Sequence, residues 1–221
     1  KNILNRQNNR TFLSQKFERP VHVIDDILRS SEEKLLEARK QRVRPGKDDK
    51  AITSWNSLMI SALVKAYRVT SEETYLKAAV RAADFIEARM SSPDGRLYRI
   101  FKNGKPKLNS YLDDYAFYVN SLIDLFEVLP IPRYVNSALT HTDFMLDHFW
   151  DAQRNDGFFF TSDDHEELII RTKNYYDLAI PSGNSVAALN LLRLYHFSQR
   201  DEFLEKSEDI FKSVSSIARD N

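Results

Sequence analysis

The sequence predicts an all-α fold of antiparallel helical hairpins, with small β-hairpins in the connections. Three observations carry this prediction. Apolar residues recur at three- and four-residue spacing along most of the chain, which is the periodicity of an amphipathic helix. The 221 residues include only five glycines, about a third of average usage, so little irregular backbone is expected. Short and long connections between the predicted helices alternate.

Seven helices are predicted from this periodicity. Residues 53–69 carry one apolar stripe, and residues 72–90 add alanine pairs that let a neighbouring helix approach closely. Residues 111–129 are apolar around most of the helix, so this helix is expected to be buried on several sides. The predicted helices span residues 24–41, 53–69, 72–90, 111–129, 132–149, 182–198 and 201–218.

Helix starts carry capping residues. Thr53 or Ser54 can cap the second predicted helix, and Ser182 can cap the sixth. Ser110, followed three residues later by Asp113, matches a capping box with a short acid.

Two β-hairpins are predicted between the helices. In residues 96–108 an apolar run meets an Asn103-Gly104 turn, which is a strong hairpin signal. In residues 157–171 two apolar runs flank the polar tip SDDHEE. This tip lacks the spacing and the glycine of an EF-hand loop, so no calcium site is predicted there.

The lengths of the connections distinguish two ends of the predicted bundle. Links of about two residues alternate with long ones, in the order 42–52, 70–71, 91–110, 130–131, 150–181 and 199–200. Because helices joined by short links run antiparallel, all long links are expected at one end. Functional residues lie preferentially on loops, so the site is expected at that end.

The three helices that start from the end with long links open on polar sequences. These are DDKAITSWN at 48–56, YLDDY at 111–115 and PSGNS at 181–185. Asp49 and Asp114 are 65 positions apart, and Asp114 and Ser182 are 68 apart. This is the period of a two-helix unit with a long return loop, so a weak internal repeat is predicted.

Composition excludes several classes of protein. The 32 Lys and Arg balance 32 Asp and Glu, which argues against a nucleic-acid partner. No apolar run approaches the ~18 residues of a membrane span, and no signal peptide opens the chain. The absence of cysteine excludes disulfides and thiolate sites and fits a cytoplasmic location. Since the chain starts at Lys1 without a Met, we expect it to be a piece of a longer protein.

These motifs also resemble those of a known family. The segments RVRPGKDDKAITSWNSLMISALVKA, YLDDYAFYVNSLIDLFE and GFFFTSDDHEELIIRTKNYYDLAIPSGNSVAALNLLRL are similar to hallmark segments of the spermatogenesis-associated protein 20 family. The resemblance runs over essentially the whole chain. It implies a helical region related to the (α/α)6 toroids of six-hairpin glycosidases and N-acylglucosamine 2-epimerase-like enzymes. In the family this region follows a thioredoxin-like domain.

The resemblance implies a toroid whose inner helices begin at a substrate mouth. Seven predicted helices are about half of the twelve in a closed toroid. We therefore predict one partial toroid domain over residues 1–221, with a polar segment at 1–22 and about seven helices over 23–221. Half a toroid leaves the inner faces uncovered, so self-association is expected. Ser57 stands where the family usually has a glycine after its Trp-Asn pair, which can stiffen this helix start.

Two aspartate pairs are the candidate catalytic groups. Asp48 and Asp49 precede one inner helix, and Asp113 and Asp114 open the next. Adjacent helix positions point about 100° apart, so one residue of a pair can cap while the other faces the mouth. Neighbouring helix axes lie ~8–10 Å apart, which suits the ~6.5–9.5 Å of an inverting glycosidase pair. Asp49 and Asp114 are the predicted catalytic pair, and helix capping is the structural alternative for each.

Predicted substrate-binding residues lie around the same helix starts. Trp55 beside Asn56 can form a sugar-stacking platform, and the alternative for Trp55 is a core position. Ser182 and Asn184 begin a helix whose free N–H groups can hold a polar substrate group, or form an ordinary cap. The basic residues can neutralise an anion or form ion pairs. The predicted set is Asp48, Lys50, Trp55, Asn56, Asp113, Tyr115, Lys173, Ser182 and Asn184.

Two functions of different classes fit these observations. The first is a carbohydrate-active toroid, glycosidase- or sugar-isomerase-like, that takes a sugar or glycan and needs no cofactor or metal. The second is a non-catalytic helical binding or scaffold module accompanying a thioredoxin-like domain, in which the aspartates are caps. No histidine lies at a motif helix start, which disfavours an epimerase that depends on histidine.

Overall fold

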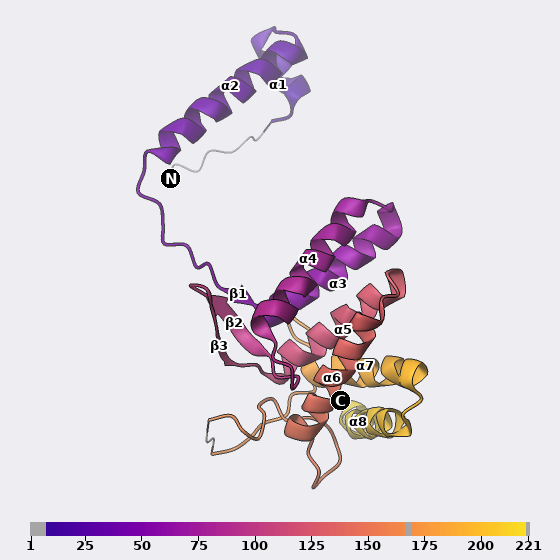
Figure 1. The fold of residues 1–221 in the computed structure, drawn as a ribbon. Helices are drawn as coiled ribbons and strands as arrows, with labels where there is room; N and C mark the ends of the chain where they lie inside the picture. Colours follow the sequence, from indigo (N-terminus) through magenta and orange to yellow (C-terminus); the bar gives the residue numbers. More distant parts are fainter. Residues whose placement is uncertain (1–7, 167–168, 220–221) are drawn as a thin grey trace. The chain divides into compact units, whose positions relative to one another are not determined.

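A computed structural model describes residues 8–166 and 169–219, with side chains described through residue 215. Within these residues the fold is mostly helical with one small sheet (Figure 1). The elements are α1 (Arg10–Phe17), α2 (Val21–Lys40), β1 (Ala51–Ile52), α3 (Thr53–Thr70), α4 (Glu73–Met90), β2 (Tyr98–Lys102), β3 (Lys105–Asn109), α5 (Leu112–Val128), α6 (Pro132–Phe149), α7 (Gly183–Ser198) and α8 (Asp201–Arg219).

Contacts within the chain divide it into two compact units, Lys1–Asp48 and Asp49–Asn221. The first unit contains α1 and α2. Helix α1 was not expected within the polar segment 1–22. It forms because the Asn9 side chain accepts a hydrogen bond from the Phe12 amide at 2.8 Å. Residues 1–7 of that segment lie outside the described residues, and the single domain over 1–221 stays a prediction.

The helices of the second unit form three hairpins, α3/α4, α5/α6 and α7/α8 (Figure 1). Helix α5 packs against both α3 and α7, and each of these three inner helices packs against its hairpin partner. Most of α5 is buried on all sides, as its apolar circumference predicts. All seven predicted helices are confirmed, and the links 70–71, 130–131 and 199–200 are short. The contacts between the inner helices follow the same order along each chain segment, from Ser54–Asp114 to Ser61–Asn120 and from Gly183–Asp113 to Arg193–Asp124, so these three helices run parallel to one another.

The hairpin predicted at 96–108 is confirmed, and it belongs to a three-stranded antiparallel sheet in the order β1-β2-β3. Asn103 and Gly104 have φ of 53° and 76°, the left-handed conformations of a type I′ turn. Strand β1 extends the sheet by pairing Ile52 with Ile100, directly before α3 begins. The sheet is thus attached to the start of an inner helix.

The hairpin predicted at 157–171 is wrong, because its described residues form no strand. One bridge joins Trp150 to Phe158, and the Phe160 amide donates to the Thr172 carbonyl at 2.7 Å. Side chains occupy other backbone groups of this segment. The Arg171 guanidinium donates to the Thr161 carbonyl at 2.6 Å, so a regular ladder does not form. Leu168 of the predicted second strand lies outside the described residues.

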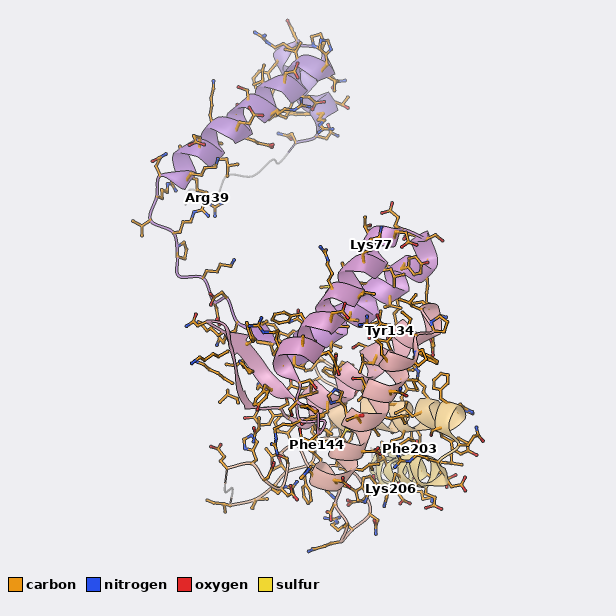
Figure 2. All side chains as sticks on the ribbon, in the orientation of Figure 1. Arg39, Lys77, Tyr134, Phe144, Phe203 and Lys206 are labelled. Atoms are coloured by element: carbon orange, nitrogen blue, oxygen red, sulfur yellow. The ribbon has the colours of Figure 1, made fainter. Side chains whose placement is uncertain are left out.

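The core of the second unit lies between the inner and outer helices. Figure 2 marks Phe144 on α6 and Phe203 on α8, and both are buried. The Phe144 ring stacks on Tyr115 of α5 with ring centroids 5.4 Å apart. This packing fixes the start of α5 against α6. Among the described helices, none is long and apolar enough to cross a membrane.

Candidate functional site

The candidate site lies where the N-termini of α3, α5 and α7 meet. Asp114 connects the first two of these helices and is fully buried. Its Oδ1 accepts from the Ser54 amide at 2.9 Å, and its Oδ2 accepts from the Tyr111 amide and from Arg99, each at 3.0 Å. Burial raises the pKa of Asp114, while Arg99 and the amide donors oppose that shift. Asp114 thus connects α3, α5 and β2.

This arrangement corrects two capping predictions. Neither Thr53 nor Ser54 caps α3; the cap position is Ile52, and the Thr53 hydroxyl donates to the Tyr98 carbonyl at 2.6 Å. Asp114 of α5 instead binds the free amide of Ser54. The capping box predicted from Ser110 and Asp113 is shifted by one residue, because Asp114 accepts from the Tyr111 amide. The two consecutive aspartates left the position of the capping box open in the sequence. In the structure the Tyr111 amide bonds Asp114, so Asp114 is the acid of the box.

Asp113 lies on the other side of the α5 terminus, next to the first residue of α7. It is only partly buried, and Gly183 of α7 approaches its carboxylate closely. Burial and the negative charge of Asp114 raise the pKa of Asp113 to about 6, and Arg99 and the Gly183 backbone oppose this shift. Asp113 is therefore a carboxyl group that can exchange a proton near neutral pH.

Asp49 and its neighbours occupy a different position. The Asp49 side chain is 55% exposed and forms an ion pair with Lys102 at 3.3 Å. Lys102 and Arg99 are three positions apart on β2, so their side chains leave opposite faces of the strand. The contacts of Asp49 and Asp114 thus lie on different faces of the sheet. Asp48 is exposed in the first unit, and Lys50 is exposed just before β1.

The predicted residues around α7 hold the loop before it. Ser182 caps α7 as predicted, since its hydroxyl accepts from the Ser185 amide at 3.1 Å. The fully buried Asn184 accepts from the Phe158 amide at 2.7 Å and donates to the Phe158 carbonyl at 3.0 Å. Lys173 donates to Asp151 at 2.5 Å and also bonds Asp156, so its ammonium is paired.

The residues predicted on α3 and α5 divide between surface and core. Trp55 is 65% exposed, so the core position weighed for it does not apply. Asn56 donates to the Ile52 carbonyl at 2.8 Å within the first turn of its own helix. Tyr115 is buried, and its hydroxyl accepts from the Leu97 amide at 2.9 Å. Burial raises the pKa of the Tyr115 phenol well above its ordinary value, which removes it from proton transfer at neutral pH.

Arg99 at this junction was missed by the sequence predictions, and Gly183 was considered only as part of the helix start at 182–184. Arg99 is an arginine inside an otherwise apolar strand run, which is a signal for a buried acidic partner. Gly183 stood out only as a glycine in the first turn of a helix.

Within the described residues, one group could hold a metal ion, formed by His148, Asp163 and Asp164. Asp164 already bonds Arg96, so a cation is present beside it.

Solved structures similar to this chain define its class. It superposes on D-mannose isomerase with a TM-score of 0.60 and 17% identity, covering 74% of this chain and 41% of that one. An inactive variant of the α-1,6-mannanase of glycoside hydrolase family 76 from Salegentibacter sp. gives 0.59 and 12%, covering 74% and 46%. An unsaturated glucuronyl hydrolase from Bacillus sp. gives 0.58 and 14%, covering 78% and 49%. The chain therefore has the fold of part of an α/α toroid.

Sequence relatives match nearly the whole chain. Human spermatogenesis-associated protein 20 is 32% identical over 99% of this chain, and the rat protein is 30% identical over 99%. The chain is thus homologous to a segment of the spermatogenesis-associated protein 20 relatives, and it spans 29% of the length of these two proteins. No protein-family model matches the chain.

Proposed function

We propose that this chain is the part of a carbohydrate-active α/α toroid that carries a proton-transfer carboxyl group. The observation that carries the proposal is Asp113, a partly buried carboxyl with a pKa of about 6 where the inner helices begin. A group with that pKa is populated in both protonation states near neutral pH, as a general acid or base requires. The similar solved structures include sugar isomerases and glycan hydrolases, which supports a sugar or glycan substrate.

Within this proposal the two consecutive aspartates have different tasks. Asp113 exchanges the proton, and Asp114 acts as a positioning residue because its oxygens are occupied by three donors. The similar mannanase was studied as an inactive variant in which two consecutive aspartates are changed to alanine. That precedent supports a role for a consecutive pair here.

The remaining predicted residues fit the proposal unequally. Asp49 stays the predicted second carboxylate, although its contact with Lys102 does not favour pairing with Asp114. The exposed ring of Trp55 supports a stacking platform at the start of α3. Lys173, Ser182 and Asn184 support the loop that borders the substrate mouth, by the ion pairs and hydrogen bonds given above.

The test measures conversion of sugars by proton NMR of their anomeric signals. The substrates are D-mannose, cellobiose, an α-1,6-mannotetraose and an unsaturated glucuronyl disaccharide. Asp113→Asn is expected to lower kcat by ~10²–10⁴-fold, because it removes a proton-transfer group. Asp143→Asn is the matched control, since Asp143 lies on the outer helix α6, in an ion pair with Arg200. Conversion that survives Asp113→Asn, or wild-type protein that converts and binds none of these sugars, contradicts the proposal.

A non-catalytic binding or scaffold module is the second candidate, and Asp114 favours it. A carboxylate that connects α3, α5 and β2 has a complete structural explanation without any reaction. On this alternative, changes at Asp113 and Asp114 alter the melting temperature and no sugar binds. We also propose a thioredoxin-like partner domain for this module. A cytoplasmic location is proposed as well, and the absence of cysteine supports it.

Self-association is supported by apolar side chains on the inner helices. Met59 of α3 is 57% exposed, and Leu189 of α7 is 48% exposed. Light scattering across a range of concentrations tests this proposal, and a monomeric mass throughout contradicts it.

A further inference from the structure

The first residue of α7 makes an unusually close approach to the start of α5. A methyl carbon added at Gly183 would lie 2.6 Å from Asp113 Oδ1 and 2.8 Å from Leu112 Cγ. Contacts this short are not tolerated without movement. Gly183 is not in the left-handed conformation for which glycine is usually selected, since its φ is not positive. The space that a side chain would need is what requires glycine here.

The neighbours of Gly183 differ in how freely they can move. Leu112 is 2% exposed, and its amide donates to the Phe160 carbonyl at 3.0 Å, so it is held by both packing and hydrogen bonding. Asp113 is only partly buried. A side chain at position 183 would therefore displace the Asp113 carboxylate toward solvent.

We propose that Gly183 is a positioning residue for Asp113, whose carboxylate keeps its place because the start of α7 carries no side chain there. The proposal rests on the proposed function for the role of Asp113, and on the contacts alone for the role of Gly183. It makes the backbone of one inner helix the support for a functional group on the next. The Ser182 side chain caps the same turn, accepting from the Ser185 amide.

The charges that act on Asp113 are few. Asp114 on α5 raises its pKa and Arg99 on β2 lowers it. The first turn of α7 contains no charged residue, and Ser54 at the start of α3 bonds Asp114. A shift in the titration of Asp113 after a change at position 183 therefore reports a movement of the carboxylate.

The experiment follows the carboxyl carbon of Asp113 by NMR in protein labelled with 13C-aspartate, with Asp113→Asn assigning the signal. The wild-type midpoint is expected near 6. In Gly183→Ala it is expected to fall by about one unit or more toward the ordinary value near 4, because hydration of the carboxylate outweighs the loss of the Gly183 backbone donor, which lowers the pKa in the wild type. An unchanged or higher midpoint in the folded variant overturns the proposal.

Two control variants separate this effect from general damage. Gly46→Ala adds the same methyl group where nothing lies within 4 Å, and it should leave the midpoint unchanged. Ser185→Ala removes hydrogen bonds of the same helical turn, to Asp177 at 2.9 Å, without adding atoms near Asp113. A fall in the Asp113 midpoint in Ser185→Ala equal to that in Gly183→Ala also overturns the proposal.

A second measurement applies even where Gly183→Ala folds poorly. If the added methyl group meets the Asp113 carboxylate, Gly183→Ala should lower the melting temperature less in an Asp113→Ala background than in the wild type. Equal losses in both backgrounds contradict the proposal. Neither measurement uses a substrate, so the positioning role can fail or hold independently of sugar conversion.

Discussion

Two polar clusters lie toward opposite ends of α5, and they use their carboxylates differently. The N-terminal cluster consists of Asp113, Asp114 and Arg99. The Arg193 cluster is further along the helix, where Arg193 of α7 donates to Asn120, Asp124 and Glu127 of α5, each at 2.8 Å. Both clusters hold inner helices together. In the first, one cation faces two carboxylates, whereas Arg68 also pairs with Glu127 in the second and balances its charges.

This difference shows where a proton-transfer group can arise. In the Arg193 cluster each carboxylate has a guanidinium partner within hydrogen-bond distance. In the N-terminal cluster Arg99 and two backbone amides donate to Asp114. The charged form of Asp113 is therefore disfavoured, and its pKa is raised by burial and by the charge of Asp114. Of these two adjacent residues of α5, Asp114 thus holds the helices together, and Asp113 is the one able to exchange a proton.

The largest expected effect is loss of the Asp114 carboxylate. Asp114→Ala should lower the free energy of unfolding by ~3–5 kcal/mol, because it leaves Arg99 and the Ser54 and Tyr111 backbone amides without their acceptor. Urea denaturation measures this change. Asp49→Ala is the matched control, and its exposed ion pair should contribute ~0–1 kcal/mol. Equal losses for the two variants would remove the distinction between Asp114 and Asp49.

The Arg193 cluster should give the next largest effect. Arg193→Met is expected to cost ~2–3 kcal/mol in urea denaturation, since Asp124 is only 7% exposed and loses its guanidinium partner. Arg68→Met removes the other, more exposed arginine that pairs with Glu127, and should cost ~0–1 kcal/mol. A larger loss for Arg68→Met than for Arg193→Met would contradict the described cluster.

The pH dependence of stability distinguishes the two clusters directly. Since the pKa of Asp113 is about 6 in the folded state and near 4 when unfolded, the folded state binds more protons between those values. The free energy of unfolding therefore falls as pH rises from about 4 to about 6, by ~1–2 kcal/mol after solvent screening. Denaturation of wild type and Asp113→Asn across this range measures the difference, which should disappear in the variant. Parallel curves would show that Asp113 titrates normally.

The smallest effect on stability is expected at the surface of α3. Trp55→Ala should change the free energy of unfolding by no more than ~0.5 kcal/mol, because the ring is largely exposed. If the ring stacks on sugar, calorimetry with α-1,6-mannotetraose should show a loss of affinity. Val69→Ala, at the far end of α3 and 86% exposed, is the control and should leave that affinity unchanged. Equal affinity in wild type and both variants would exclude the platform.

Much of the fold could be predicted from the sequence because its helices have local signals. All seven predicted helices appear, and the Asn103-Gly104 turn folds as expected. Helix α1 was missed because a side-chain cap at Asn9, more than an apolar stripe, starts it. The hairpin at 157–171 was wrong because Arg171 and Asn184 bind backbone groups that a strand would have paired, and Asn184 comes from α7, well beyond the segment.

The lengths of the connections predict which ends of the helices come together. Short links force antiparallel hairpins, and that arithmetic places Asp113, Asp114 and Ser182 at the same end of the bundle. The different roles of the adjacent carboxylates Asp113 and Asp114 depend on packing between elements that are distant in the sequence. Burial, the Ser54 amide, the Arg99 guanidinium and the approach of Gly183 act from α3, β2 and α7, and none of these partners is adjacent to Asp113 or Asp114 in the chain. The lengths of the links set the direction in which each helix runs, whereas the protonation of a carboxyl group depends on the elements packed around it.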